Sequence, residues 1–200
     1  MGQRDGEFRS KLQTADPEKL ARNSGAQLEE GELNLKMLDE TYRVSLPDYE
    51  IESSTVEVGE ADEQLILSYL SRLKEGGVEG EGEWLSFREL PDGNFYSAHF
   101  KKSTEVRLTR LFQNDIESFK ATANSLAGEE ISISDAGYGF QILPRLKIGL
   151  VFWSGGDEFS DEVNVLFEDT AADCLSTEGL SIIGNKFCGR FIKKSQGVKQ

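Results

Sequence analysis

The sequence predicts an α+β fold: a single domain in which a mixed or antiparallel sheet packs with three to four helices. Three observations lead to this prediction. Segments with alternating apolar residues come in pairs, segments with apolar residues at helical spacing separate the pairs, and 200 residues are enough to bury one substantial core. Paired strands with helices between them favour this class over a regular βαβ alternation.

Both ends of the chain are expected to be tails, with the domain between them. Residues 1–16 carry mixed charge and show no apolar period, so we expect a disordered tail there. The domain then covers residues 17–194, and residues 195–200 form the second tail.

The first part of the domain combines helix signals with an alternating pair. Asp16 suits an N-cap, Pro17 suits the first turn, and Gly25 suits the end of a helix. Further along, four apolar residues spaced by three or four positions predict a second helix. The expected elements are a helix from Pro17 to Gly25, strands at Glu32–Leu38 and Tyr42–Leu46, and a helix at Asp62–Leu73.

The second part is expected to contain the longest helix, Thr104–Leu126, because one apolar stripe runs along it and Gly128 follows. A closing helix at about Thr177–Lys193 should bury Phe187 and Phe191, which lie one turn apart. The strand-like segments are Trp84–Phe87, Ile131–Ser134, Gly139–Leu143, Lys147–Trp153 and Val163–Phe167. Lys147–Trp153 and Val163–Phe167 should be central in the sheet, since both of their faces are apolar.

Charge and composition exclude several classes of partner. The net charge is −14, with 36 acidic residues against 22 basic ones, so we expect no nucleic-acid face. No apolar run approaches the roughly 20 residues that span a bilayer, and the N-terminus has no signal core. Two distant cysteines, Cys174 and Cys188, form no redox or zinc pair, so the expected compartment is the cytoplasm.

Several blocks, in this order, resemble the bacterial and archaeal family catalogued as domain of unknown function 3786. The longest is WLSFRELPDGNFYSAHF, at Trp84–Phe100. The resemblance covers roughly residues 17–193. The other blocks are Tyr69-Leu70 at the end of a helix, Leu143-Pro144, Phe152-Trp153, Asp157-Glu158-Phe159, Val165-Leu166-Phe167 and Leu175-Ser176-Thr177-Glu178.

The family has no established activity, so the resemblance implies only the kind of metabolism in which the protein takes part. Some members carry an additional cysteine-rich iron–sulfur module similar to that of corrinoid iron–sulfur proteins in anaerobic one-carbon metabolism. The implied role is therefore beside corrinoid, tetrapyrrole or iron–sulfur chemistry, with an iron–sulfur or corrinoid protein as partner. This chain lacks the cysteines that would hold such a cluster.

Four residues are candidates for a ligand site: His99, Tyr96, Trp84 and Trp153. His99 is the only histidine and could ligate a metal or a macrocycle, and the aromatic residues could line a pocket for a planar ligand. In strand-like alternation His99 points away from Ala98 and Phe100. The alternative is that the histidine is a structural or surface residue and that the aromatic residues belong to the core.

Three carboxylates, Asp157, Glu158 and Asp161, are candidates for a metal site, with Glu162 beside them. Carboxylates after a strand suit Mg²⁺ or Ca²⁺, although the spacing departs from the EF-hand pattern. The alternative is a solvated acidic loop.

Two functions lead at this point, and a purely structural subunit is a third alternative. One is a non-catalytic binding or accessory domain that takes a corrinoid or another tetrapyrrole, or assists an iron–sulfur or corrinoid partner. The other is a divalent-metal-dependent enzyme that uses the Asp157–Glu162 carboxylates with His99. The sequence contains neither the serine-hydrolase motif GxSxG nor the phosphate-binding motif GxxxxGK[ST], which favours the binding domain.

Overall fold

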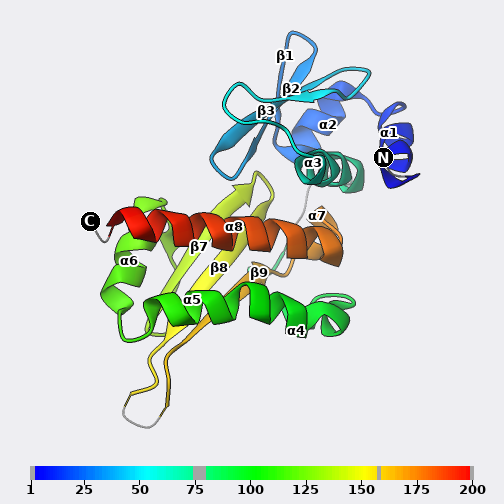
Figure 1. Cartoon of the computed structure of the whole chain (residues 1–200). Helices are drawn as coiled ribbons and strands as arrows, with labels where there is room; N and C mark the ends of the chain where they lie inside the picture. Colours follow the sequence, from blue (N-terminus) through cyan, green and yellow to red (C-terminus); the bar gives the residue numbers. More distant parts are fainter. Residues whose placement is uncertain (1–2, 74–79, 157–158, 199–200) are drawn as a thin grey trace. The chain divides into compact units, whose positions relative to one another are not determined.

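The computed structural model describes residues 3–73, 80–156 and 159–198 (Figure 1). Helices and antiparallel strands occur in separate stretches of the chain, so the α+β class is confirmed. The chain divides into two compact units, each with a sheet of its own. The first unit comprises Met1–Gly80, Gln141–Leu146 and Thr170–Gly179, and the second comprises Glu81–Phe140, Lys147–Asp169 and Leu180–Gln200.

The prediction that the strands pair in one sheet was therefore wrong. Residues near 32–46 and those near 131–167 were expected in the same sheet, but they form two. Alternation shows that a segment is a strand and which of its faces is apolar. It does not show which strand lies next to it, because any strand with an apolar face could be the neighbour.

The sheet of the first unit is a four-stranded antiparallel meander in the order β1-β2-β3-β4. Leu33, Leu35 and Met37 point to one face and are almost completely buried, as their alternation predicts. The pair at its centre matches the predicted strands to within a few residues. The strands are β1 (Gln27–Glu29), β2 (Glu32–Met37), β3 (Glu40–Ser45) and β4 (Ile51–Glu52).

Two helices of the first unit begin and end where the sequence indicates. Helix α2 spans Pro17–Ser24, with the Asp16 side chain accepting N–H groups of the first turn and Gly25 ending it at φ 74°. Helix α3 spans Glu60–Arg72 and has two buried residues, Tyr69 and Leu70, near its end. The short helix α7 (Ala171–Cys174) completes the unit together with the segment around Arg145, whose backbone N–H donates to the Tyr69 hydroxyl at 3.0 Å.

The first predicted tail is a helix instead. Helix α1 spans Gln3–Leu12, and Leu12 is only 1% exposed. The Tyr49 hydroxyl donates to the Leu12 carbonyl at 2.6 Å, and the Arg9 guanidinium contacts Glu63 and two backbone carbonyls. These partners lie about 40 or more positions away in sequence. The local pattern, which has few apolar residues, therefore gave no sign of the helix.

The sheet of the second unit has the strand order β5-β9-β8-β7-β6. The two strands predicted to be central, β8 and β9, both lie inside it and pair with each other, so this prediction is confirmed. Ile131–Ser134, which was expected to be a strand, is a turn segment instead. The strands are β5 (Trp84–Ser86), β6 (Glu129–Glu130), β7 (Ala136–Leu143), β8 (Leu146–Trp153) and β9 (Glu162–Glu168).

Helices cover one face of this sheet (Figure 1). Aromatic rings fill the layer between helices and sheet: Phe191 lies 5.6 Å from Phe112 and from Phe119, and Phe119 lies 5.6 Å from Phe152, measured between ring centroids. The elements are the 3₁₀ helix η1 (Phe87–Glu89) and the α-helices α4 (Gly93–Ser103), α5 (Glu105–Phe112), α6 (Ile116–Ser125) and α8 (Thr177–Val198). None of the helices in the described part of the chain is both long enough and apolar enough to cross a membrane.

The predicted long helix Thr104–Leu126 is two helices, α5 and α6. The chain turns at Asn114, whose φ is +59°, and Asp115 then caps α6 by accepting the N–H of Ser118. An asparagine tolerates this left-handed conformation, and an aspartate before a helix is a start signal. The apolar stripe continues across the break, which is why periodicity alone did not reveal it.

The closing helix buries its predicted apolar stripe, and this gives a test of the core. The helix continues to Val198 and buries Ser195, so the prediction of a tail from residue 195 was wrong for residues 195–198. Phe187 and Phe191 are 3% and 0% exposed, and the Phe187 ring lies 4.8 Å from that of Phe140. We expect Phe187→Ala to lower the free energy of unfolding by about 3–5 kcal/mol, because a large cavity is left in a packed core. Chemical denaturation measures the loss. The exposed Lys193→Ala is the control, and a comparable loss in both variants contradicts the assignment.

Helix α1 gives a second prediction. Leu12→Ala should lower the free energy of unfolding by roughly 2 kcal/mol or more, since a buried leucine is truncated. Lys11→Ala, one residue earlier and exposed, should have little effect. Thermal melts of the two variants make the comparison, and equal melting temperatures show that α1 adds nothing to the stability of its unit.

Candidate functional site

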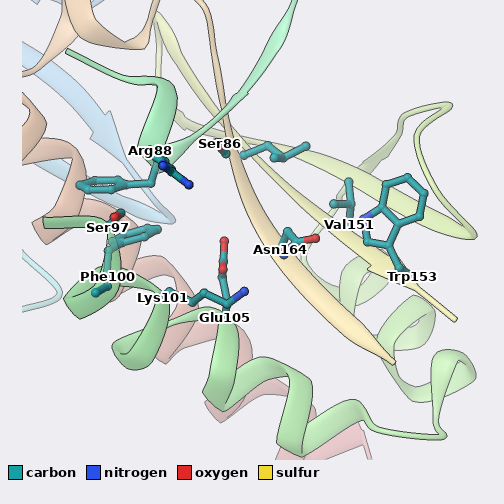
Figure 2. A pocket seen from close by; sticks show the side chains of 12 residues that line it. Ser86, Arg88, Ser97, Phe100, Lys101, Glu105, Val151, Trp153 and Asn164 are labelled. Atoms are coloured by element: carbon teal, nitrogen blue, oxygen red, sulfur yellow. The ribbon is translucent and has the colours of Figure 1, made fainter. Parts of the chain in front are cut away.

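A pocket of about 500 Å³ lies in the second unit, at the edge of strand β9 (Figure 2). It exists because β5 is short. Within the described residues, β5 pairs with β9 only from Leu166 to Glu168, and after Ser86 the chain turns into η1. The lining residues are Ser86, Phe87 and Arg88 from β5 and η1, Ser97, Ala98, Phe100 and Lys101 from α4, Glu105 from α5, and Val151, Trp153, Asn164 and Leu166 from β8 and β9.

Side chains of α5 replace the missing strand along this edge. The Val163 N–H donates to the Thr109 hydroxyl at 2.9 Å, and the Val165 N–H donates to the Glu105 carboxyl at 3.2 Å. A buried backbone N–H without an acceptor destabilises the fold. These two hydrogen bonds supply the acceptors that a longer β5 would have supplied. The edge is thereby closed to a further strand, but space for a small molecule remains beside it.

Glu105 is the buried carboxyl group of the pocket, at 8% exposure. Burial raises its pKa, and the Val165 N–H, the Lys101 ammonium and a hydrogen bond from the Asn164 side chain offset part of that rise. Figure 2 shows its carboxyl pointing into the space between Asn164 and Phe100. The pocket therefore contains a buried acid whose pKa lies above its ordinary value.

Two cationic side chains also line the pocket, Arg88 and Lys101. The Arg88 guanidinium donates to the Asn94 side-chain oxygen at 2.8 Å, and the Lys101 ammonium lies 3.8 Å from the Glu162 carboxylate. Both are exposed, so they can reach an incoming ligand without losing a buried partner. Their positive charges stand out in a chain of net charge −14.

Stacked aromatic rings make the wall between η1 and α4 rigid. The rings of Phe87 and Phe100 lie 4.1 Å apart and within 13° of parallel, and both contact Phe167 of β9. Gly184 of α8 permits this arrangement, because a Cβ atom there would lie 2.9 Å from the Phe100 ring. The wall is thus part of the hydrophobic core of the unit.

Of the four predicted ligand residues, the structure brings only Trp153 to the pocket, where its side chain is 46% exposed. Trp84 instead covers Gly139 and Gly149, with no room for a Cβ at Gly149, which would lie 2.9 Å from the indole. His99 and Tyr96 lie on exposed positions of α4 and outside the lining. His99 was expected on a strand, but Tyr96–Phe100 is helical, since Gly93 starts a helix after the turn at Asp92.

The predicted metal residues fall into two groups. Asp161 is buried, and its two carboxylate oxygens accept the N–H groups of Asn114 and Gly155 at 2.7 and 3.1 Å. Asp157 and Glu158 lie outside the described residues. Among the residues that the structure does describe, no group of three or more histidine, cysteine or acidic side chains is arranged to hold a metal ion. The Mg²⁺ or Ca²⁺ site therefore stays a prediction.

Of the lining residues, only Trp153 was predicted from the sequence as a ligand residue, and the most informative ones that were missed are Arg88, Lys101, Glu105 and Asn164. A signal existed for Glu105, because it lies three and seven positions before Leu108 and Phe112 on the apolar stripe of its helix. A carboxylate at a buried helical position needs a hydrogen-bond partner. The other three are polar residues at positions that sequence alone cannot distinguish from ordinary surface.

The fold and the pocket together describe an α+β domain with a small-molecule-sized site at a sheet edge. Residues 16–190 match the sequence profile of the family described as Domain of unknown function (DUF3786). The chain therefore belongs to this family, as its sequence blocks indicated. Comparison with curated proteins and with solved structures found no match in either set.

Asp161 gives a test of structural against metal-binding roles. Asp161→Ala leaves the N–H groups of Asn114 and Gly155 without their acceptor and should lower the free energy of unfolding by about 1–3 kcal/mol. A purely structural role gives the same loss in melting temperature with EDTA and with millimolar Mg²⁺ or Ca²⁺, and this is the result that we expect. A loss that appears only with the cation shows that Asp161 is a ligand.

Proposed function

We propose that the chain is a non-catalytic binding domain for a small planar anion, which it holds in the pocket at the edge of β9. The observation that carries this proposal is the presence, in one pocket of about 500 Å³, of an exposed indole and two cationic side chains. Pockets of this size with a few polar groups suit ligands of small-molecule size. The charges and the indole then indicate the chemistry of the ligand.

The indole supports a planar ligand. Trp153 belongs to the pocket lining and lies beside Val151, on the side away from Arg88 and Lys101 (Figure 2). The indole is 46% exposed, so one of its faces is free to contact a ligand. A flat conjugated ring system would stack on it, as aromatic groups prefer.

The two cations support an anionic group. Arg88 offers a planar fork of N–H donors that matches a carboxylate, and Lys101 adds a second positive charge from α4. Both cations line one pocket of a chain whose net charge is −14. This contrast favours a carboxylate-bearing ligand.

A carboxylate-bearing tetrapyrrole combines both features, since it has a flat ring with acidic side chains. A corrinoid is the second candidate of this kind. Its peripheral groups are mainly neutral amides, so Arg88 and Lys101 favour a carboxylated tetrapyrrole over it. One edge of such a macrocycle, with its carboxylates, would enter the pocket while the ring lies against Trp153.

The pocket hydroxyls support a binding role over a hydrolytic one. Ser86 donates to the Glu89 carboxylate at 2.7 Å as part of the cap of η1, and Ser97 donates to the Asn94 carbonyl at 3.1 Å. Both hydroxyls therefore serve helix geometry, and neither is oriented by a histidine as a serine nucleophile would be.

The proposal extends to setting and partner. An iron–sulfur or corrinoid protein is the proposed partner, as the family resemblance implies. We place the domain in the cytoplasm, which is supported by the burial of both Cys174 and Cys188 as reduced thiols. The metal-dependent enzyme stays a prediction that depends on Asp157 and Glu158.

Tryptophan fluorescence tests the proposal, because the chain has two tryptophans and only one lies in the pocket. In Trp84→Phe, we expect coproporphyrin III to quench the remaining Trp153 emission with saturation. Cobinamide, which lacks the carboxylates, should bind at least about tenfold more weakly.

Trp153→Ala, followed by the porphyrin absorbance, is the matched test of the indole and should weaken coproporphyrin binding, because the stacking surface is lost. Arg88→Gln and Lys101→Gln should each weaken coproporphyrin binding. Affinity that is unchanged in Trp153→Ala, or when both cations are removed, contradicts the proposed site.

A further inference from the structure

Glu105 is an unexpected group in a site for an anion. It lines the same pocket as Arg88 and Lys101, and its carboxylate would repel a bound anion if it kept its charge. The carboxyl is nevertheless built into the fold, since it accepts the Val165 N–H at the edge of β9. The pocket must therefore bind an anion beside an acid that it cannot move away.

We infer that Glu105 takes up a proton from solvent when the pocket binds an anion, so that the site selects the anion together with a proton. This inference rests on the proposed anion-binding function. It adds to that function a residue that governs specificity and a dependence on pH.

The geometry allows Glu105 to be protonated without loss of the fold. A carboxylic acid keeps one oxygen that accepts the Val165 N–H, and its other oxygen becomes an O–H donor. In Figure 2 the carboxyl points into the pocket between Asn164 and Phe100, where an anionic oxygen would accept that donor. The neutral acid thereby changes from a repelling group into a recognition group.

The groups around Glu105 act on its pKa in opposite directions. Lys101 of α4 favours the charged form, as do the Val165 N–H and Asn164 of β9, whereas Glu162 of β9 opposes it. From α8, the buried Cys188 thiol has its pKa raised by burial and by Glu105 itself, and Arg107 of α5 partly offsets this. Arg88 of η1 completes the lining as a permanent cation. Burial outweighs these contributions, and the pKa of Glu105 lies above its ordinary value.

The sign of the pH dependence follows from linkage. A bound anion adds negative charge beside Glu105, so the pKa of Glu105 is higher in the complex than in the empty pocket. Protons are then bound on complex formation, and affinity rises as pH falls from the pKa of the complex toward the pKa of the empty pocket. Below both values the affinity levels off, because Glu105 is already neutral.

The probe for the test is 1-pyrenesulfonate, a flat aromatic anion whose sulfonate stays charged throughout the range. In the Trp84→Phe background its affinity is measured by Trp153 quenching between about pH 8 and about pH 5. We expect an increase that approaches about tenfold per pH unit in its steepest part, the limit for one linked proton. Calorimetry in buffers of different ionisation enthalpy should show proton uptake, and the uncharged 1-pyrenemethanol should show neither effect.

Glu105→Gln separates this mechanism from general electrostatics. The amide keeps an acceptor for the Val165 N–H and carries a permanent donor, so the variant should bind 1-pyrenesulfonate tightly and with little dependence on pH. Glu162→Gln removes an equal charge at an exposed position nearby and should retain the pH dependence. His99→Asn should retain it as well, which excludes the exposed histidine of α4 as its source.

Two results overturn the inference. One is an affinity of the Trp84→Phe protein for 1-pyrenesulfonate that does not change with pH while Glu105 is intact, and the other is a pH dependence that survives Glu105→Gln. A thermal melt of Glu105→Gln verifies that the variant is folded, and Glu105→Asp, with a titratable but shorter side chain, should recover part of the dependence. Failure of both pyrene probes to quench Trp153 refutes the proposed function itself, which is a different outcome.

Discussion

The second unit depends on how the edge of β9 obtains its hydrogen bonds after β5 has ended. Val163 and Val165 direct their N–H groups away from β8, where no strand of the described chain pairs with them, and Thr109 and Glu105 of α5 accept them. Side chains of α5 thus supply the hydrogen-bond acceptors that the backbone of a neighbouring strand would supply. A side chain fills less of the edge than a strand does, and the pocket is the space that remains.

Packing around this edge fixes the pocket from several directions. The stacked Phe87 and Phe100 join η1 and α4 to the core, and the capping box between Ser86 and Glu89 sets the turn by which the chain leaves β5. On the other face, Trp84 lies over Gly149 and thereby anchors the same short strand. The walls are therefore held by core contacts, while the exposed Arg88, Lys101 and Trp153 remain available for recognition.

Local signals predicted much of the fold and little of the site. The caps at Asp16 and Gly25 were predictable because each residue type is strongly preferred at its end of a helix. The apolar residues of α8 recur with a period that only a helix satisfies. Helix α1 escaped detection because distant partners such as Tyr49 hold it. His99 was a reasonable candidate by chemistry, yet a helix placed it on an exposed position outside the pocket.

By itself, the sequence determined the α+β class, the positions of most helices and strands, the interior placement of β8 and β9, and membership of the family. Each of these depends on residue types and on spacings along the chain. Only the tertiary structure decided that the strands form two sheets, that β5 ends early, and that Glu105 meets Arg88, Lys101 and Trp153 in one pocket. The reason is physical: strand pairing and pocket formation join segments far apart in sequence, and any compatible apolar face or hydrogen-bonding edge could satisfy the same local pattern.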